Sequence, residues 1–350
     1  MLDKDFLQYK VGGLLYMPAF QKNFVHNFSN GKLPKITSVA FCLEDSIRTE
    51  SLDAAEASLA EILRELESLE KNLPLIFVRI RSPRHLEIFH EKIGSRSKIL
   101  TGYILPKFDM QNAGGFIQVA KEINREFNAE RAKPIYIMPT LESHRVADIS
   151  TRRTELLSLK QSLDEVKSLV LNIRVGVNDF CNLYGLRRNV NQTIYDLGVV
   201  RDVLIDILNV FAKNYVVAGS VWNFFGGDGW SNGLRRELEL DRANGFIGKS
   251  AIHPAQLPII FDALKVSRAD FDDANQILNW NSNTHGVTKS VDGSRMNEIN
   301  CHLAWARRIK ILSEIYGVAL KATEQLVGGS PLKHVSAKTA DNFISDGVIL

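Results

Sequence analysis

The stretch IYIMPTLES, residues 135–143, is a short apolar run that ends in a carboxylate, Glu142. Comparable runs rich in Val, Ile, Phe and Tyr recur along the chain, with helix-like segments between them. This alternation is expected of βαβ units and a parallel sheet. The runs cover residues 14–18, 38–43, 75–80, 102–106, 135–139, 171–177, 215–220 and 246–252. Because eight parallel strands close a barrel, the sequence predicts an α/β fold of the TIM-barrel type.

Residues 52–69 and 113–127 carry apolar side chains at the three-and-four spacing of a helix with one buried face, so we expect them in the outer ring of the barrel. Two further helical patterns follow the eighth run, at residues 269–280 and 296–316. We therefore expect three parts. They are a TIM-barrel domain over residues 10–265, a C-terminal helical extension over residues 266–320 and an unassigned tail over residues 321–350.

The composition is that of an ordinary globular protein, with 350 residues, 45% hydrophobic and 24% charged side chains. A formal net charge of +3 without a basic stripe does not indicate nucleic-acid binding. Cys42, Cys181 and Cys301 are far apart and show neither metal-ligand nor disulfide-framework spacing. No apolar run approaches the roughly 18 residues of a membrane span, and no secretory leader is found. We expect a cytoplasmic protein without a membrane or nucleic-acid partner.

Polar residues close several of the apolar runs, and in a TIM barrel the chemistry lies at these carboxyl ends. Glu142 and Asp179 follow the fifth and sixth runs, and one or two carboxylates are what Mg²⁺ typically takes from a protein. A metal there would leave room for a chelating 2-oxo acid, while Arg79 could pair with a carboxylate or enolate oxygen. Helix capping and salt bridges are the alternative for each single carboxylate. The other candidates at run ends are Glu44, Asp45, Lys107, Asn178 and His253.

Eight sequence pieces occur in an order that resembles one known family. They are LLYMP at Leu14, LEDS at Leu43, VRIRSP at Val78, ILPK at Ile104, IMPTLES at Ile137, GVNDF at Gly176, GKSAIHPAQ at Gly248 and VDGSRMNE at Val291. Together they resemble the citrate lyase beta-subunit family, the HpcH/HpaI aldolase group, over about residues 14–316. The glycine-rich stretch between the seventh and eighth runs looks like the branch found in tellurium-resistance gene clusters.

The resemblance implies a magnesium-dependent carbon–carbon bond lyase or aldolase that cleaves or forms a 2-hydroxy acid, or its thioester, through a 2-oxo acid and an enolate. Glu142 and Asp179 match the family's Mg²⁺ ligands, and Arg79 matches the arginine that holds substrate and enolate. Asp292 lies in a piece similar to the family's C-terminal motif, whose aspartate acts as a catalytic group in a neighbouring subunit's active site. The implied assembly is a homotrimer or a hexamer. A turn aspartate before Gly293 is the alternative.

Several further residues have a functional and a structural interpretation. Glu44 and Asp45 match an acidic pair that positions metal-bound water and orients a cationic side chain, or they form a strand-end salt bridge. Lys107 either faces the substrate or neutralises Glu142. His253 either contacts the substrate or caps the last helix start together with the proline that follows it.

Departures from the family pattern concern both the metal and the carrier. Cys42 and Asn178 stand where the family usually has acids, which reduces the negative charge around the cation and leaves Asn178 as a candidate for substrate contact. Gly12 and Gly13 stand where thioester-using members carry a basic residue, so coenzyme A as a carrier is in doubt.

Residues 226–233 would form a glycine-rich loop over the mouth of the barrel, a place where this fold commonly binds phosphate, or they are a plain connecting loop. Arg187 and Arg188 could neutralise such an anion, or they are a solvated pair. Two rival functions are open besides the lyase. One is a metal-dependent acyl-thioester hydrolase, and the other is a non-catalytic metabolite-binding scaffold on the same barrel.

Overall fold

The computed structural model describes residues 4–21, 23–69, 72–127, 133–281 and 285–319. These residues form two compact units, with the division after Ile260. The barrel unit precedes the division and the C-terminal unit follows it. Within the described ranges, none of the helices combines the length and the apolar composition that a membrane crossing requires.

Seven parallel strands form the sheet of the barrel unit. They are β1 (Gly13–Pro18), β2 (Ser38–Cys42), β3 (Leu75–Arg79), β4 (Gly102–Leu105), β5 (Tyr136–Leu141), β6 (Arg174–Val175) and β7 (Lys249–Ala251). Their order in the sheet is β6-β5-β4-β3-β2-β1-β7, so β6 and β7 are the two edges. Each strand coincides with one of the predicted apolar runs.

The seventh predicted run, residues 215–220, is not a regular strand, but it closes the sheet. Val217 makes a parallel bridge to Ile173 beside β6, and Gly219 makes one to Lys249 in β7. The N–H of Ala218 donates to the carbonyl of Ile173 at 2.8 Å, and the N–H of Ile247 donates to the carbonyl of Val217 at 2.9 Å. Because both edges are bridged by this segment, the sheet closes into a ring of eight segments, which confirms the predicted TIM barrel.

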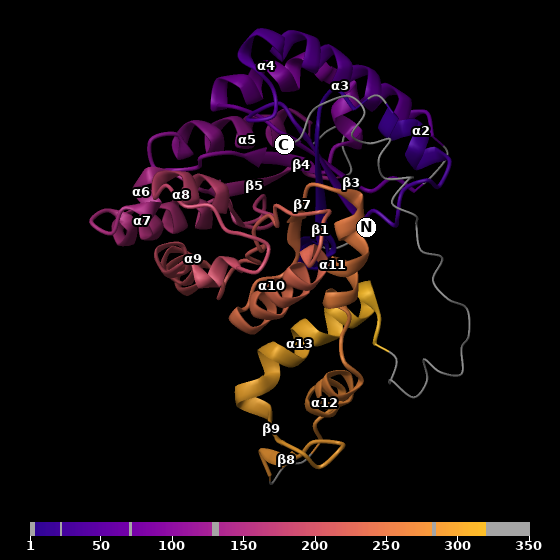
Figure 1. Cartoon of the computed structure of the whole chain (residues 1–350), viewed down its shortest axis with the longest axis vertical. Helices are drawn as coiled ribbons and strands as arrows, with labels where there is room; N and C mark the ends of the chain where they lie inside the picture. Colours follow the sequence, from indigo (N-terminus) through magenta and orange to yellow (C-terminus); the bar gives the residue numbers. More distant parts are fainter. Residues whose placement is uncertain (1–3, 22, 70–71, 128–132, 282–284, 320–350) are drawn as a thin grey trace. The chain divides into compact units, whose positions relative to one another are not determined.

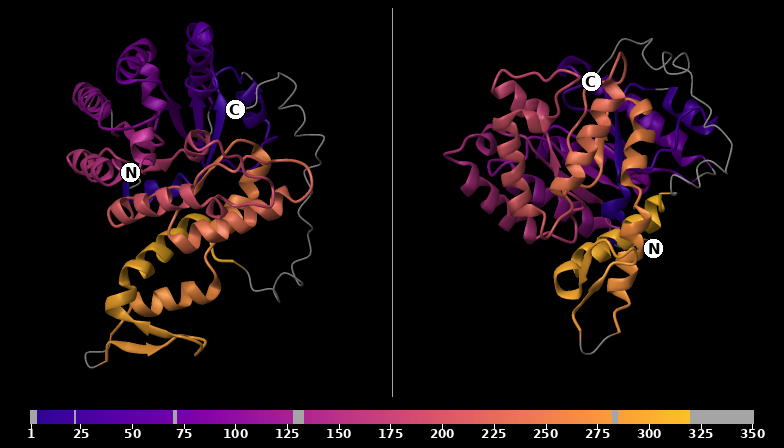
Figure 2. Two further views of the ribbon diagram at one scale, coloured as in Figure 1. Left: turned by 60° about the vertical axis from the view of Figure 1, so that its left-hand side comes forward. Right: turned by 60° about the horizontal axis from the view of Figure 1, so that its bottom comes forward.

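Helices follow most strands and surround the sheet. The indigo-to-magenta helices lie side by side around the outside of the strands in Figure 2 (left). The helices are α1 (Lys4–Lys10), α2 (Asn23–Ser29), α3 (Leu52–Glu67), α4 (Pro83–Ile93), α5 (Ala113–Phe127), α6 (His144–Ala147), α7 (Arg152–Asp164), α8 (Val177–Leu183), α9 (Gly198–Phe211), α10 (Trp230–Asn244) and α11 (Leu257–Leu264).

Packing inside and outside the sheet follows the periodicities of the strands and of the helices, respectively. Leu14, Ala40, Phe77, Ile104 and Met138 come from five neighbouring strands and form one buried cluster. Outside, α3 buries the stripe of apolar residues that its sequence predicts, which ends at a fully buried Leu66. Burying an aliphatic side chain of this size contributes roughly 1.5–3 kcal/mol, so the closed core fixes where the strand ends lie.

The described part of the C-terminal unit contains the end of α11, two further helices and a hairpin. The helices α12 (Arg268–Leu278) and α13 (Ile299–Tyr316) pack against each other, and the strands β8 (Val287–Lys289) and β9 (Met296–Glu298) pair antiparallel (Figure 1). Residues 296–298, predicted as the start of a helix, are therefore a strand. The reason is local, since the turn before them leads the chain back along β8, and α13 begins only at Ile299.

Candidate active site

Arg79 binds three carboxylates at the carboxyl end of the barrel. Its Nη2 atom lies 3.0 Å from Oε1 of Glu142, 2.9 Å from Oε2 of Glu44 and 3.2 Å from Oδ2 of Asp45. Arg79 is the last residue of β3, while Glu44 and Glu142 follow the ends of β2 and β5. The parallel sheet thus brings together side chains that are far apart in the sequence.

Lys107 completes this cluster with its side chain and with its backbone. Its Nζ atom lies 2.5 Å from Oε1 of Glu44 and 2.8 Å from Oδ1 of Asp45. Its backbone N–H donates to Oε1 of Glu142 at 2.8 Å. Its φ of 47° is the only positive value among the described residues other than glycine, and such a conformation costs about 1–3 kcal/mol. Lys107 therefore contacts Glu142 through a strained backbone, while its ammonium group pairs with the other two acids.

Asp179 joins the cluster from the first turn of α8, which begins directly after Gly176. A Cβ atom at residue 176 would lie 1.8 Å from Oε2 of Glu142 and 2.5 Å from its Cβ, so only glycine leaves room for this carboxylate. Asp179 is close enough to raise the pKa of Glu142 by charge repulsion. We call Glu44, Asp45, Glu142 and Asp179 the acid cluster.

The acid cluster has carboxyl groups with shifted pKa values. Burial raises the pKa of Glu142 to about 7, although Arg79 opposes the shift, and Asp179 adds to it. Burial also raises the pKa of Glu44 and of Asp179. For Asp45, burial acts upward, but hydrogen bonds with Glu44 and Lys107 outweigh it and lower the pKa. Such separated pKa values are typical of functional sites.

The donor set of the acid cluster suits a hard divalent cation. Four carboxylates face the two cationic groups of Arg79 and Lys107, so two negative charges are uncompensated when all four acids are ionised. Glu142 and Asp179 would provide two carboxylate ligands, and the other positions would be left to water and substrate. Among the described residues no group of three or more His, Cys, Asp or Glu side chains has the geometry of a complete protein metal cage.

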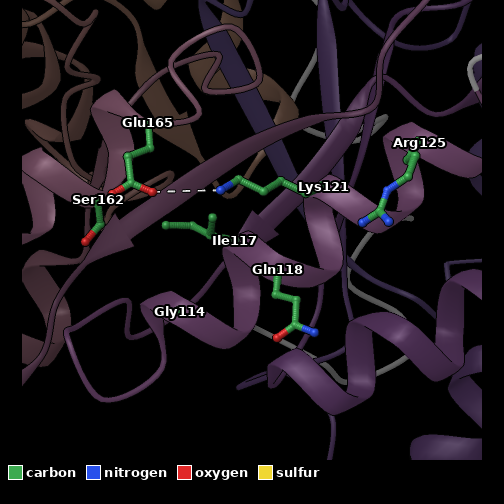
Figure 3. A pocket seen from close by; sticks show the side chains of 7 residues that line it. All are labelled: Gly114, Ile117, Gln118, Lys121, Arg125, Ser162 and Glu165. Atoms are coloured by element: carbon green, nitrogen blue, oxygen red, sulfur yellow. Dashed lines mark ion pairs between the residues drawn. The ribbon is translucent and has the colours of Figure 1, made fainter.

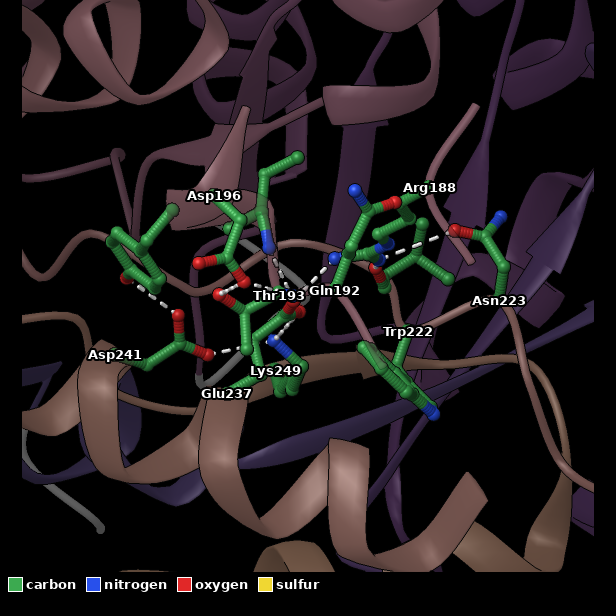
Figure 4. Close-up of polar contacts among 12 residues, drawn as sticks. Arg188, Gln192, Thr193, Asp196, Trp222, Asn223, Glu237, Asp241 and Lys249 are labelled. Atoms are coloured by element: carbon green, nitrogen blue, oxygen red, sulfur yellow. Dashed lines mark hydrogen bonds and ion pairs between the residues drawn. The ribbon is translucent and has the colours of Figure 1, made fainter. Parts of the chain in front are cut away.

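Arg188, a sequence candidate for substrate contact, lies in a second, buried network (Figure 4). Its guanidinium pairs with Glu237, donates to the carbonyl of Val221, and lies 4.8 Å from the ring centroid of Trp222. It also donates to Oδ1 of Asn223 at 3.2 Å. The guanidinium of Arg188 therefore already has hydrogen-bond acceptors, and all of them lie within the barrel unit.

Asn178 connects this network to the acid cluster. Nδ2 of Asn223 donates to Oδ1 of Asn178 at 3.1 Å, and Asn178 precedes Asp179 in α8. The exposed amide of Asn178 is thus oriented by a residue that Arg188 holds in turn.

Lys249 belongs to the GKSAIHPAQ piece, but no local pattern assigns it a role. It is fully buried, and its Nζ atom lies 2.8 Å from Oε1 of Glu237 and 2.7 Å from Oδ2 of Asp241 (Figure 4). The hydroxyl of Tyr195 donates to Asp241 at 2.7 Å. This cluster holds α10 against β7. The one sequence signal that could have predicted the cluster is a lysine inside a predicted strand.

His253 caps the segment that follows β7. Its Nδ1 atom accepts from the N–H of Ala255 at 3.2 Å, and its ring stacks on Phe225 with 4.8 Å between centroids. Phe225 directly precedes the glycine-rich loop, in which Gly227 and Gly229 have positive φ values of 77° and 78°. The structure therefore shows the capping interaction, and a substrate contact of His253 remains a prediction.

Asp292 lies in the turn between β8 and β9 and is exposed. Its Oδ1 atom accepts from the Ser290 hydroxyl at 2.6 Å and from the N–H of Ser294 at 2.9 Å, and these bonds lower its pKa to about 2. Gly293 follows with a φ of 74°. These are the contacts of a turn aspartate, and its catalytic role in a neighbouring subunit remains a prediction.

Gly12 and Gly13, whose lack of a basic side chain put coenzyme A in doubt, lie away from the acid cluster. Gly12 and Gly13 lie at the amino end of β1, whereas the acid cluster lies at the carboxyl ends of the strands. A Cβ atom at Gly248 would lie 2.4 Å from the carbonyl oxygen of Gly12, so the backbones are in close contact there. The lack of a basic residue at this position therefore does not argue against a thioester at the mouth.

Two surface hollows are separate from these residues. One, of 310 Å³, lies between α5 and α7 and includes the pair formed by Lys121 and Glu165, whose charged atoms are 3.8 Å apart (Figure 3). The other, of 460 Å³, is lined by residues of α6 to α9, including Tyr184. Neither contains a member of the acid cluster.

The protein is a TIM barrel with an enzyme-like site. This site consists of the acid cluster and its partner Arg79, at the carboxyl ends of the strands. The chain belongs to the family described as carbon–carbon bond lyases of the TIM-barrel fold, whose model matches residues 5–318. This confirms the family that the sequence pieces predicted.

Solved structures agree with the fold. A citrate lyase from Burkholderia xenovorans LB400 is similar with a TM-score of 0.66 and 15% identity, covering 91% of this chain and 96% of that one. CitE from Mycobacterium tuberculosis, in complex with magnesium, acetoacetate and coenzyme A, has a TM-score of 0.57 and 17% identity, covering 87% and 99%.

Curated relatives match over a shorter range. A (3S)-malyl-CoA thioesterase of Cereibacter sphaeroides is 31% identical over 136 residues, which is 38% of this chain and 45% of the relative. The same enzyme of another strain of this species is 35% identical over 104 residues, 29% of this chain and 35% of the relative. The chain thus spans less than half the length of these curated relatives.

Proposed function

We propose that the protein is a Mg²⁺-dependent lyase or aldolase that cleaves or forms a 2-hydroxy acid, or its thioester, through a 2-oxo acid and an enolate. The observation that carries the proposal is the buried Glu142 carboxylate, fixed by Arg79 and the Lys107 N–H beside Asp179. We assign Glu142 and Asp179 as the metal ligands. Bound Mg²⁺ would act as a Lewis acid that polarises the substrate oxygens and favours loss of the hydroxyl proton.

The side chains of this protein would then do the following in the cleavage direction. As the carbon–carbon bond breaks, its electron pair passes to the departing carbon, and Arg79 donates hydrogen bonds to the enolate oxygen that develops. Glu44, Asp45 and Lys107 hold Arg79 in place through their ion pairs. We assign the proton transfers to Asp292 of a neighbouring subunit. Its low pKa keeps it ionised, so it would take up the proton lost by the substrate hydroxyl and then return this proton to the enolate carbon.

Further contacts of the substrate are part of the same proposal. Asn178 lies next to Asp179 and would face a polar group of the substrate, while Arg188 would position Asn178 through Asn223. His253, which stacks on Phe225, would contact the substrate where the glycine-rich loop begins. The magnesium, acetoacetate and coenzyme A bound by the Mycobacterium tuberculosis protein support the same classes of ligand here.

The assembly and its location are proposals of the same kind. We propose a homotrimer, or a hexamer, in the cytoplasm, in which residues 266–320 of one subunit contribute Asp292 to the next barrel. The exposed position of Asp292 in the hairpin turn is compatible with this role.

A metal-dependent acyl-thioester hydrolase is the second candidate function. The observation that favours it is the similarity to (3S)-malyl-CoA thioesterases. The same acid cluster could activate a water molecule for attack on a thioester carbonyl. Release of free thiol from an acyl-coenzyme A without formation of a 2-oxo acid would identify this reaction.

The test is an incubation with Mg²⁺ in which pyruvate, oxaloacetate, glyoxylate and their hydroxy-acid adducts are presented with and without coenzyme A and followed by mass spectrometry. Glu142→Gln removes the buried ligand with little change of shape, and Glu239→Gln is a matched control at an exposed position of α10. We expect turnover in the wild type and the control, and none with Glu142→Gln. Turnover that persists in Glu142→Gln or without Mg²⁺ would refute the proposal.

A further inference from the structure

Arg174, the first residue of β6, is a buried cation for which the described part of the chain offers no carboxylate as hydrogen-bond partner. Only 2% of it is exposed. Its Nη2 atom donates to the hydroxyl of Ser250 at 2.7 Å. Its Nε and Nη1 atoms find no acceptor among the described residues. A desolvated guanidinium is costly unless an anion or several acceptors satisfy it, so this site lacks a partner of the kind that a bound ligand provides.

Arg174 lies directly below the acid cluster. Its Cα pairs with Thr140 of β5, and Glu142 is two residues further along that segment. Alternate residues of a strand point to the same face, so Thr140 and Glu142 share the face that leads to the mouth. The Thr140 hydroxyl is also buried without a partner in the described part of the chain. Two adjacent strands therefore present unpaired hydrogen-bonding groups to the same place.

The Tyr16 ring connects Arg174 to the site. Its centroid lies 5.9 Å from Cζ of Arg174, and its hydroxyl is within electrostatic range of Arg79 and Glu142. Ser250, the partner of Arg174, is in register with Leu14, two residues before Tyr16 on β1. The guanidinium thus lies at the level of the strands, below the strand-end residues that form the acid cluster.

Charge balance also points to an anion. The acid cluster carries four negative charges when ionised, and two are matched by Arg79 and Lys107. A divalent cation held as in the proposed function would match the other two. The charge of Arg174 is then in excess, and a negatively charged substrate would balance it.

We propose that Arg174 forms an anion-binding subsite at the floor of the active site, and that it selects substrates whose 2-oxo acid part carries a second carboxylate. This inference rests on the proposed function. A carboxylate and an oxo group held by the metal would lie at the level of Glu142, whereas the unpaired N–H groups of Arg174 lie deeper. A carboxylate at the far end of a 2-oxo dicarboxylate would accept a charge-assisted hydrogen bond from Nε or from Nη1.

The experiment compares ligands that differ only at that end. With Mg²⁺ present, binding is measured by calorimetry and by the shift in melting temperature for two matched pairs. They are 2-oxobutanoate against oxaloacetate, and 2-oxopentanoate against 2-oxoglutarate. The variants are Arg174→Met, which removes the charge, and Arg174→Lys, which keeps it. Arg153→Met, at an exposed position of α7, is the control.

We expect the wild type to bind at least one dicarboxylate about tenfold or more tightly than its matched monocarboxylate, because a charge-assisted hydrogen bond is gained. Arg174→Met should abolish this ratio by lowering dicarboxylate affinity more than monocarboxylate affinity. Arg174→Lys, which keeps a charged donor, should keep most of the ratio, and Arg153→Met should keep all of it.

Two results would overturn the inference while the proposed function stands. One is an equal affinity of both members of each pair for the wild type, a measurement that needs no variant to fold. The other is a dicarboxylate preference that survives in Arg174→Met, or a loss that affects both members equally. Failure of every 2-oxo acid to bind in a Mg²⁺-dependent manner would instead overturn the proposed function and this inference with it.

Discussion

Gly176 and Glu142 are in direct contact at the centre of the candidate active site, where the backbone of residue 176 lies against the buried carboxylate. A Cβ atom at residue 176 would lie 1.8 Å from Oε2 of Glu142. The residue that precedes α8 therefore controls the position of the carboxylate that follows β5. A substitution at residue 176 therefore tests whether Glu142 holds the metal.

Gly176→Ala should displace the Glu142 carboxylate and weaken Mg²⁺ binding by about tenfold or more, because the ligand can no longer occupy its position. Gly114→Ala in α5 is the matched control, since a Cβ atom there meets nothing within 4 Å. The control should leave binding unchanged. Calorimetric titration with Mg²⁺ measures both variants, and equal affinities would show that Glu142 is not a ligand.

Lys107→Gly should be more stable than Lys107→Ala by about 1 kcal/mol, because glycine adopts a positive φ without strain. Both variants lose the same ammonium group, so the difference reports the backbone conformation at φ 47°. Urea unfolding measures it. An alanine variant as stable as the glycine variant would contradict the strained geometry at this position.

The pKa of about 7 for Glu142 predicts a pH dependence of the metal-free protein. Because the pKa in the folded state is raised above its usual value, the neutral carboxyl favours folding. That contribution is complete below pH 4.5, the ordinary value, and is lost as the pH rises through about 7. The melting temperature should fall over this range more in the wild type than in Glu142→Gln.

Mg²⁺ should act in the opposite direction, because only the ionised carboxylate binds it. We expect the affinity for Mg²⁺ to rise as the pH increases from about 6 to about 8. The increase should disappear in Glu142→Gln. A Mg²⁺ affinity that does not depend on pH in the wild type would indicate that another group holds the metal.

Lys249→Met should lower the free energy of unfolding by about 3–5 kcal/mol, because it leaves Glu237 and Asp241 buried without their cation. Lys213→Met, at an exposed position after α9, should change it by less than about 0.5 kcal/mol. Chemical denaturation measures both. A small loss in Lys249→Met would mean that the cluster is already solvated.

Asp292→Asn and Glu142→Gln should each be inactive alone and should complement each other when mixed. If every site takes Glu142 from one subunit and Asp292 from its neighbour, random mixed oligomers have about a quarter of their sites intact. Activity after unfolding and refolding the two variants together is the measurement. Mixtures that stay inactive would exclude a shared site. An active Asp292→Asn variant would show that Asp292 has only a structural role in its turn.

Local sequence patterns were sufficient to predict the architecture and which strand ends carry the acids. Apolar runs of strand length separated by amphipathic stretches are local properties, and a parallel barrel places every strand end at one mouth. For that reason five residues could be predicted as neighbours from their places in the sequence, although β2 and β5 are far apart along the chain. They are Glu44, Asp45, Arg79, Lys107 and Glu142.

The pairing of these groups with their surroundings could be seen only in the folded chain. Residues 215–220 close the barrel by isolated bridges, and Arg188 binds Glu237. Arg174 finds no carboxylate partner within the described ranges, and no local pattern specifies any of these three features. The strained Lys107 backbone and the contact of Gly176 with Glu142 are likewise set by packing. The physical reason is that hydrogen bonds and ion pairs depend on distances of a few tenths of an ångström between segments that only the closed core brings together.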